Sequence, residues 1–167
     1  MSLRCDVRAG PSSEPDSKKS ARPTVILADD HEAILAQASQ LLEPYFEVIA
    51  VVRDGKSAVA AVQQRPPDLV LLDMAMPMLD GIDAVRELHR LGYDGKIAFL
   101  TVQDDPMFVK VALDIGASAY ILKKSMFTDL VNGIERAIAG ETYLSSALRT
   151  PPRHPKFDQG NCPRKNN

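Results

Sequence analysis

The sequence predicts a doubly wound α/β fold, in which one parallel five-stranded sheet is covered by helices on both faces. Three observations support this prediction. Five short apolar runs alternate with five stretches whose apolar residues recur at helical spacing. The apolar runs are nearly continuous, which is typical of parallel strands that are buried on both faces. The chain has 167 residues, 45% of them hydrophobic, which suits one such domain.

The first strand is predicted at Thr24–Ala28 and the second at Phe46–Val52. Between them, apolar residues recur at the spacing of one helix face. These residues are Ile34, Leu35, Ala38, Leu41 and Leu42. Asp54 and Gly55 mark the start of a second helix. Its predicted inner face carries Ala58, Ala61 and Val62.

The other three strands are predicted at Asp68–Leu72, Lys96–Leu100 and Ala119–Leu122. The helices after the third and fourth strands should end at Gly92 and Gly116, because glycine readily adopts the left-handed conformation that closes a helix. The third and fourth helices are marked by Ile82, Val85 and Leu88, and by Phe108, Val111, Ala112 and Ile115. The fifth has the longest amphipathic stretch, with Phe127, Leu130, Val131, Ile134, Ala137 and Ile138.

Five β–α units joined by right-handed crossovers favour the strand order 2-1-3-4-5 of a flavodoxin-like sandwich. We expect this domain to span residues 24–146. Residues 1–23 are rich in polar residues and lack hydrophobic periodicity, so they are expected to be a disordered tail. Residues 147–167 are rich in proline and are expected to be a disordered tail or a truncated linker.

The composition favours a cytoplasmic protein with a cationic partner. No apolar run approaches the roughly 18 residues of a membrane span, and the first residues lack the apolar region of a secretory signal. The two cysteines, Cys5 and Cys162, lie in the polar tails. Residues 24–146 contain 10 Lys/Arg and 18 Asp/Glu, a net charge of −8. Such a body is a poor match for nucleic-acid phosphate and a good match for a divalent cation.

Polar side chains follow four of the predicted strands. Asp29 and Asp30 follow the first, Asp73 the third, Thr101 the fourth and Lys123 the fifth. Ligands of open parallel sheets bind at the carboxyl ends of the strands, near the point where the strand order reverses. We therefore expect three carboxylates, one hydroxyl and one ammonium to converge at that edge.

Three carboxylates held together repel one another, and a hard divalent cation relieves the repulsion. Mg²⁺ prefers a few carboxylates together with waters and phosphate oxygens, and Mn²⁺ could substitute for it. Beside the cation, one carboxylate can act as a nucleophile toward phosphorus while the Lys123 ammonium neutralises charge on the transferring group. The Thr101 hydroxyl could donate to a phosphoryl oxygen. The pattern therefore indicates phosphoryl transfer onto a carboxylate.

Each of these residues has a simpler interpretation when taken alone. Asp29 and Asp30 could cap the helix that follows them. Thr101 could be an ordinary β-branched strand residue, and Lys123 could be a solvated strand end. His31 is more simply a first-turn helix residue than a metal ligand. The joint placement of the polar residues at four strand ends favours a functional site.

Four segments of the sequence resemble the receiver domains of two-component response regulators. They are ILADD (26–30), LVLLDMAMPMLDG (69–81), FLT (99–101) and GASAYILKK (116–124). The resemblance covers about residues 24–144. It implies that Asp73 accepts a phosphoryl group from a sensor histidine kinase in a Mg²⁺-dependent reaction, and that the protein is a switch rather than an enzyme.

The resemblance also implies the metal ligands. Asp30 would bind Mg²⁺ directly, Asp29 would act through water, and Asp73 would also belong to the metal site. Ala75 would offer its backbone carbonyl.

The resemblance further implies how the signal spreads. Thr101 and Lys123 match the switch hydroxyl and the phosphate-binding lysine of the family. Tyr120 matches the aromatic residue that turns inward when the hydroxyl moves. The readout face would be residues 104–139, which hold the fourth helix, the fifth strand and the fifth helix. Lys124 departs from the family pattern, in which proline often follows the lysine, so the geometry of that peptide bond stays open.

The DMAMP loop and GETYLS (140–145) resemble the class that usually carries a C-terminal helix-turn-helix of the LuxR type. The residues after 146 are too few for such a domain, so we expect no DNA binding by this chain. Because no apolar run is long enough for a membrane span, we also expect no membrane association. The chain is either a stand-alone receiver or one separated from its output domain. A homodimer that forms on phosphorylation is a further expectation.

Three other hypotheses are weighed against the switch. A phosphatase of the haloacid-dehalogenase type would need an aspartate two residues after the nucleophile, where this chain has Ala75. A flavodoxin-like FMN carrier would need a phosphate-binding loop after the first strand, and Asp29 and Asp30 repel phosphate unless metal is present. A receiver that binds partners without phosphorylation is disfavoured because all five strand-end residues are present.

Overall fold

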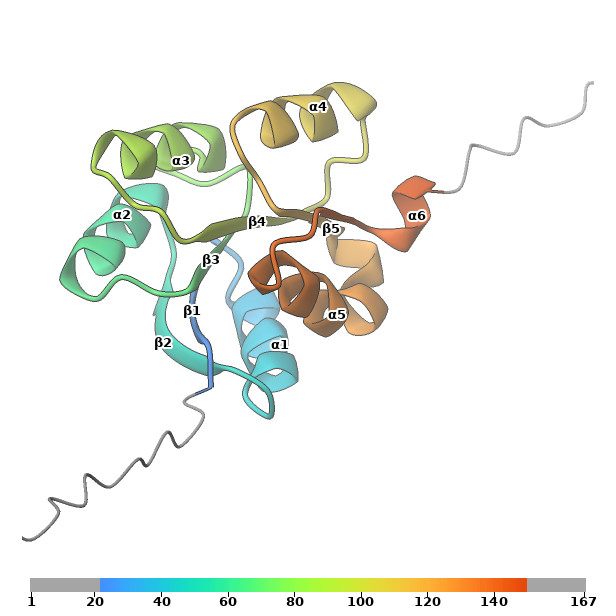
Figure 1. Cartoon of the computed structure of the whole chain (residues 1–167), viewed down its shortest axis with the longest axis horizontal. Coiled ribbons are helices and arrows are strands. Elements are labelled where there is room, and N and C mark those ends of the chain that lie inside the picture. Colours follow the sequence, from blue (N-terminus) through green and yellow to red (C-terminus); the bar gives the residue numbers. More distant parts are fainter. Residues whose placement is uncertain (1–21, 150–167) are drawn as a thin grey trace, which may run out of the picture.

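The computed structural model describes residues 22–149, and its helices and strands lie between Thr24 and Arg149 (Figure 1). The predicted disorder of residues 1–21 and 150–167 lies outside the described residues. No helix within 22–149 is long and apolar enough to cross a membrane.

The centre of the molecule is a parallel sheet in the order β2-β1-β3-β4-β5-β6. Its strands are β1 (Thr24–Ala28), β2 (Glu47–Val52), β3 (Leu69–Leu72), β4 (Lys96–Thr101), β5 (Ala119–Leu122) and β6 (Tyr143–Leu144). The first five confirm the predicted order, with ends that differ from the prediction by at most one residue. β1 and β3 are neighbours in this order, so the residues that follow them lie at the point where the strand order reverses.

Helices cover both faces of the sheet, as predicted. They are α1 (Glu32–Leu42), α2 (Gly55–Gln64), α3 (Gly81–Arg90), α4 (Pro106–Asp114), α5 (Met126–Ile138) and α6 (Ser146–Arg149), with a 3₁₀ turn at Lys123–Ser125. In Figure 1, α2, α3 and α4 lie on one side of the sheet, and α1 and α5 lie on the other.

The side chains of the sheet alternate between two apolar cores. In β1, Ile26 and Ala28 belong to the core under α2 and α3, whereas Val25 and Leu27 belong to the core under α1 and α5. All four residues are buried. β1 is therefore buried on both faces from Val25 to Ala28, and the next side chains, those of Asp29 and Asp30, are polar.

Helix ends use the polar signals in the sequence. The carboxylates of Asp54, Asp80 and Asp105 accept hydrogen bonds from backbone N–H groups in the first turns of α2, α3 and α4. Gly92 and Gly116 have φ angles of 81° and 94°, in the left-handed region, and so close α3 and α4 as predicted.

The segment after α5 was not predicted. β6 is only two residues long and pairs in parallel with β5, and α6 extends to Arg149, three residues beyond the expected boundary at 146. A strand this short has no detectable period of its own, and long-range contacts decide whether it forms.

Candidate functional site

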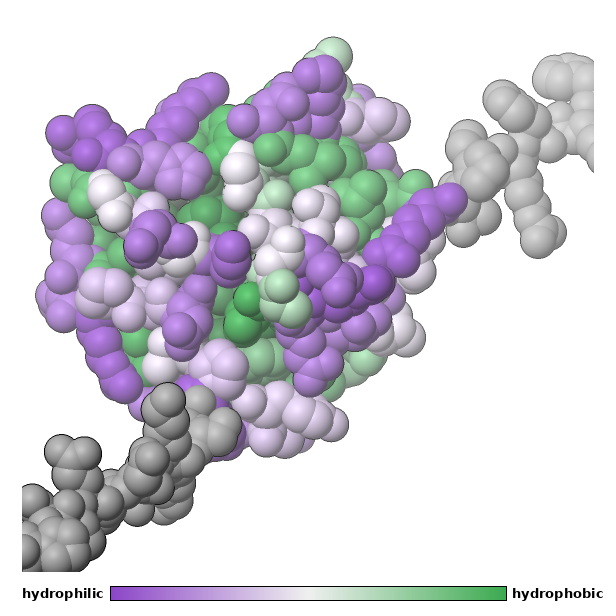
Figure 2. Space-filling view, viewed as in Figure 1, coloured by the Kyte–Doolittle hydropathy of each residue, from purple (hydrophilic) through white to green (hydrophobic). Residues whose placement is uncertain are grey.

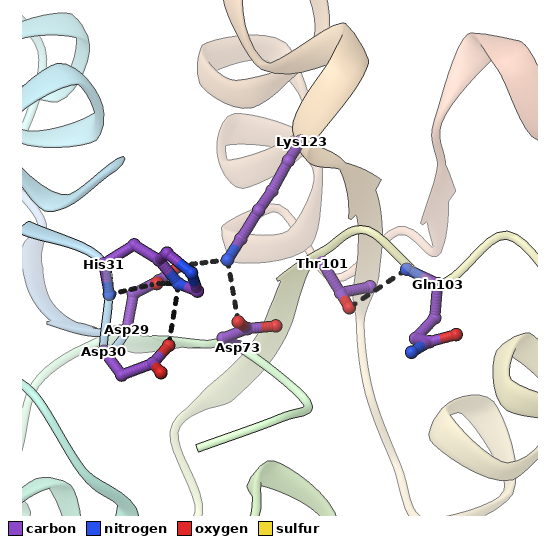
Figure 3. Close-up of polar contacts among 7 residues, drawn as sticks. All are labelled: Asp29, Asp30, His31, Asp73, Thr101, Gln103 and Lys123. Atoms are coloured by element: carbon purple, nitrogen blue, oxygen red, sulfur yellow. Dashed lines mark hydrogen bonds and ion pairs between the residues drawn. The ribbon is translucent and has the colours of Figure 1, made fainter. Parts of the chain in front are cut away.

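The predicted polar residues lie at the carboxyl ends of β1, β3, β4 and β5, where Lys123 contacts Asp29 and Asp73 while Thr101 contacts Gln103 (Figure 3). Asp29 and Asp73 are each only 3% exposed, and Thr101 is fully buried. The backbone N–H of Asp73 donates to the carbonyl of Ala28 at 2.9 Å, which fixes Asp73 beside the end of β1. The sheet therefore holds the two buried carboxylates next to each other.

Lys123 joins these two carboxylates. Its Nζ lies 2.6 Å from Asp29 Oδ2 and 2.7 Å from Asp73 Oδ2. Burial alone would lower the pKa of Lys123, but hydrogen bonds and charges from Asp29 and Asp73 outweigh burial and hold this pKa above its ordinary value. The ammonium therefore stays charged at neutral pH and offsets one of the two buried negative charges.

Asp30 and His31 form the outer part of the site. The Asp30 side chain is 38% exposed, and its Oδ1 lies 2.8 Å from His31 Nδ1. His31 Nδ1 also lies 3.2 Å from Asp29 Oδ1, which accepts a hydrogen bond from the His31 backbone N–H at 2.9 Å. His31 is the N-cap residue of α1, so neither aspartate occupies the capping position that the simpler interpretation gave them.

The side chains suit a divalent cation. Asp29, Asp30, His31 and Asp73 each offer one ligand atom, and these atoms all lie within 4.8 Å of one another. Within the described part of the chain, the Oδ1 atom of Asp73 is buried and has no hydrogen-bond partner. A buried carboxylate oxygen without a partner is costly unless a cation or a donor satisfies it. Hard oxygen ligands of this kind fit Mg²⁺ or Mn²⁺.

The loop after β3 lies tightly against the site. The N–H of Gly81 donates to the carbonyl of Met74 at 2.9 Å, which closes the loop. A Cβ on Gly81 would lie 2.2 Å from the backbone oxygen of Asp73, so only glycine fits here. Ala75 lies in this loop, two residues after Asp73, and is exposed.

Thr101 and Tyr120 meet through the loop after β4. Thr101 Oγ1 accepts a hydrogen bond from the Gln103 N–H at 3.3 Å, and the Tyr120 hydroxyl donates to the Gln103 carbonyl at 2.9 Å. The same hydroxyl lies 3.2 Å from Met74 Sδ, next to Asp73. Burial, with the charges of nearby aspartates, raises the pKa of Tyr120 above its ordinary value, so the phenol remains a donor. Tyr120 is fully buried and points inward.

The rim of the site is exposed. Val102 is 68% exposed beside the buried Thr101, and Lys124 Nζ pairs with Asp104 Oδ2 at 2.9 Å. Hydrogen bonding to Lys124 lowers the pKa of Asp104 below its ordinary value. The peptide bond after Lys123 is trans, as are all those within the described residues.

The contacts of Met74 and Gln103 with Tyr120 were not predicted from the sequence. Both lie next to predicted site residues in the chain, but only the fold shows that their atoms meet one phenol. The double contact of His31 with Asp29 and Asp30 was also not predicted.

Comparisons with known proteins agree with this geometry. Residues 25–135 match the family model of the response regulator receiver domain. The transcriptional regulatory protein DegU of Brevibacillus brevis is 34% identical over 122 residues, which are 72% of this chain and 52% of that protein. A nitrate/nitrite response regulator protein homolog of Haemophilus influenzae is 35% identical over 127 residues, which are 75% of this chain and 61% of that protein.

A solved structure has the same arrangement of elements. The two-component response regulator of the LuxR family from Aurantimonas sp. SI85-9A1 is 28% identical, with a TM-score of 0.72 over 77% of this chain and 93% of that chain. The region shared with the two curated relatives is only 52% and 61% of their own length.

Proposed function

This chain belongs to the response regulator receiver domain family, and we propose that it is a signalling switch that accepts a phosphoryl group on Asp73. One observation carries the proposal. Asp73 Oδ1 is a buried carboxylate oxygen without a hydrogen-bond partner among residues 22–149, at the edge of the sheet where Asp29 and Lys123 also lie. An oxygen in this state is available to a cation or to an electrophile.

The residues that would hold Mg²⁺ are Asp30 and Asp73, with Asp29 acting through water and Ala75 through its backbone carbonyl. When bound, the cation supplies positive charge that offsets both the carboxylates and the phosphoryl oxygens. Mn²⁺ has similar ligand preferences and should support the same reaction.

The residues of the chain have separate roles in the transfer. An Asp73 carboxylate oxygen attacks the phosphorus of a phosphohistidine on a sensor kinase. The new P–O bond forms as the P–N bond breaks, and the imidazole leaves with the electron pair and takes a proton from solvent. Lys123 moves its charge toward the phosphoryl oxygens, and Thr101 donates its hydroxyl to one of them. Later hydrolysis of the acyl phosphate restores Asp73.

Phosphorylation then shifts the equilibrium between two conformations of the domain. If Thr101 turns toward the phosphoryl group, Gln103 loses its contact with the Thr101 hydroxyl and the loop that leads into α4 is freed to move. Tyr120 holds the carbonyl of the same loop residue and so follows it. We expect the surface formed by α4, β5 and α5 to change and to be read by a partner.

The partners and the location follow from the same proposal. The phosphodonor would be a sensor histidine kinase in the cytoplasm, and the phosphorylated form would associate as a homodimer. We place the switch in residues 24–149, because the helices and strands of the described chain extend from Thr24 to Arg149. Transcription control, which the name of the relative DegU describes, would require an output domain outside the matched region, and we expect no DNA binding by the receiver domain itself.

The proposal is tested by intact-mass spectrometry after incubation with Mg²⁺ and acetyl phosphate. We expect one added phosphoryl mass in the wild type, none in Asp73→Asn, and none when the metal is chelated. Asp94→Asn, which changes an exposed carboxylate at the opposite end of the sheet, is the matched control and should behave like the wild type. No added mass in the wild type would instead favour a receiver that binds partners without phosphorylation.

A further inference from the structure

The chain does not leave the domain at the end of α5 but folds back across the edge of the sheet. We call residues 143–149, which form β6 and α6, the C-terminal strap. The N–H of Tyr143 donates to the carbonyl of Ser118 at 2.9 Å, and the N–H of Ser145 donates to the carbonyl of Tyr120 at 2.8 Å. The strap is therefore bound to the backbone of the residue whose side chain contacts the loop after β4.

Asp129 fixes one side of the strap to α5. This carboxylate is 3% exposed and accepts hydrogen bonds from Ser145 Oγ at 2.5 Å and from the Ser146 N–H at 2.8 Å. Thr128 Oγ1, on the same helix, lies 3.1 Å from Asp129 Oδ1. Charge-assisted hydrogen bonds to a buried carboxylate are among the strongest that a protein makes. Asp129 therefore acts as a latch between α5 and the strap.

Further contacts hold the strap against α5. A Cβ on Gly133 would lie 2.9 Å from the Tyr143 ring, so the absence of a side chain at Gly133 lets the ring lie against α5. The Arg149 guanidinium lies 4.6 Å from the centre of the Tyr143 ring, and its Nε donates to the Leu144 carbonyl at 2.8 Å. These contacts order the strap as far as its last described residue.

The other side of the strap is loosely packed. Leu144 and Leu148 line a groove of about 310 Å³ together with Val109 and Leu113 of α4. Figure 2 shows this groove as apolar surface between α4 and α6. Ala112 is the one residue of α4 that is fully buried, so this helix has little packing to resist a shift. A movement of α4 would change how much of Leu144 and Leu148 is covered.

We propose that the C-terminal strap is the element through which the phosphorylation signal leaves the domain, with Asp129 as the positioning residue that anchors it. Tyr120 connects the loop after β4 to the strap. Its hydroxyl holds the Gln103 carbonyl in the loop that leads into α4, and its own carbonyl holds the strap at Ser145. Asp129 fixes the strap to α5, so the strap cannot move freely when α4 shifts against Leu144 and Leu148. The shift therefore changes the path of the chain at Arg149. This inference rests on the proposed function.

Hydrogen–deuterium exchange of the full chain tests the proposal, with and without Mg²⁺ and beryllium fluoride as a mimic of the phosphoryl group. In the wild type we expect exchange in the peptide containing residues 143–149 to change by roughly tenfold, together with a change in the loop at 102–105. In Asp129→Asn, and in the milder Leu148→Ala, we expect the loop to respond while the strap changes by less than about twofold. Glu135→Gln alters an exposed carboxylate on the same helix and should retain the wild-type response.

The possible results distinguish the role of the strap from the proposed function. A loop that responds while the wild-type strap does not would overturn the role of the strap and leave the proposed function intact. If exchange in the strap still changes tenfold on addition of beryllium fluoride in both Asp129→Asn and Leu148→Ala, the anchoring role is refuted. A contact that only stabilises the strap would raise exchange equally with and without beryllium fluoride, and so would leave this tenfold change intact. A protein in which neither loop nor strap responds would contradict the proposed function itself.

Discussion

Replacement of Asp30 by asparagine should make the metal-free protein more stable and abolish its response to Mg²⁺. The ligand atoms of Asp29, Asp30 and Asp73 lie within 4.8 Å of one another. Two negative charges at that distance repel by about 3.5 kcal/mol at an effective dielectric constant of 20, and by about 0.9 kcal/mol in bulk water. Since the Asp30 side chain is 38% exposed, the lower value applies. Asp30 faces the two negative charges of Asp29 and Asp73, and the Lys123 ammonium that they share offsets one of these. We therefore expect Asp30→Asn to gain about 1 kcal/mol in the free energy of unfolding in EDTA.

The wild type should behave in the opposite way when the metal is added. At ten times its dissociation constant, Mg²⁺ should stabilise the wild type by about 1.4 kcal/mol. Asp30→Asn should show almost none of this gain, although asparagine can still accept a hydrogen bond from His31. Urea denaturation in EDTA and in MgCl₂ measures both free energies, and Asp94→Asn provides the control. If Asp30→Asn were less stable than the wild type in EDTA, or kept the full Mg²⁺ response, the charge-repulsion argument would be refuted.

Three further substitutions test other contacts. Lys123→Met removes the ammonium shared by Asp29 and Asp73 and should destabilise the metal-free protein by about 3–5 kcal/mol. Part of this loss should be recovered in Mg²⁺. Equal free energies of unfolding for variant and wild type in EDTA would contradict this expectation. Tyr120→Phe removes the donor to the Gln103 carbonyl and should cost about 0.5–1.5 kcal/mol in urea denaturation. Gly81→Ala must displace the Asp73 backbone, so it should lower the melting temperature and slow phosphorylation by acetyl phosphate; an unchanged rate in a folded variant would show that the loop tolerates a Cβ.

The sequence predicted the fold well because its signals are local. Apolar runs that end at polar residues located five strands, and Gly92 and Gly116 marked two helix ends. The same runs predicted that Asp29, Asp73 and Lys123 would meet, because strand ends of a parallel sheet share one edge.

Other features depend on contacts between distant residues. The strand β6 has two residues and is held by hydrogen bonds to β5 and by Asp129, which lies 16 positions before Ser145. The inward orientation of Tyr120 depends on Met74 and Gln103, which no periodicity brings together. The pairing of the Lys123 ammonium with both Asp29 and Asp73 likewise depends on interatomic distances that a sequence pattern does not specify.

The central claim is that Asp73 is the phosphoacceptor, and trapping of the acyl phosphate tests it most directly. Borohydride reduces an aspartyl phosphate to homoserine, and peptide mass mapping then locates the converted residue. After treatment with acetyl phosphate and Mg²⁺, we predict homoserine at position 73, none at 29 or 30, and none anywhere without the metal. Homoserine at another aspartate, with Asp73 unchanged, would contradict the account.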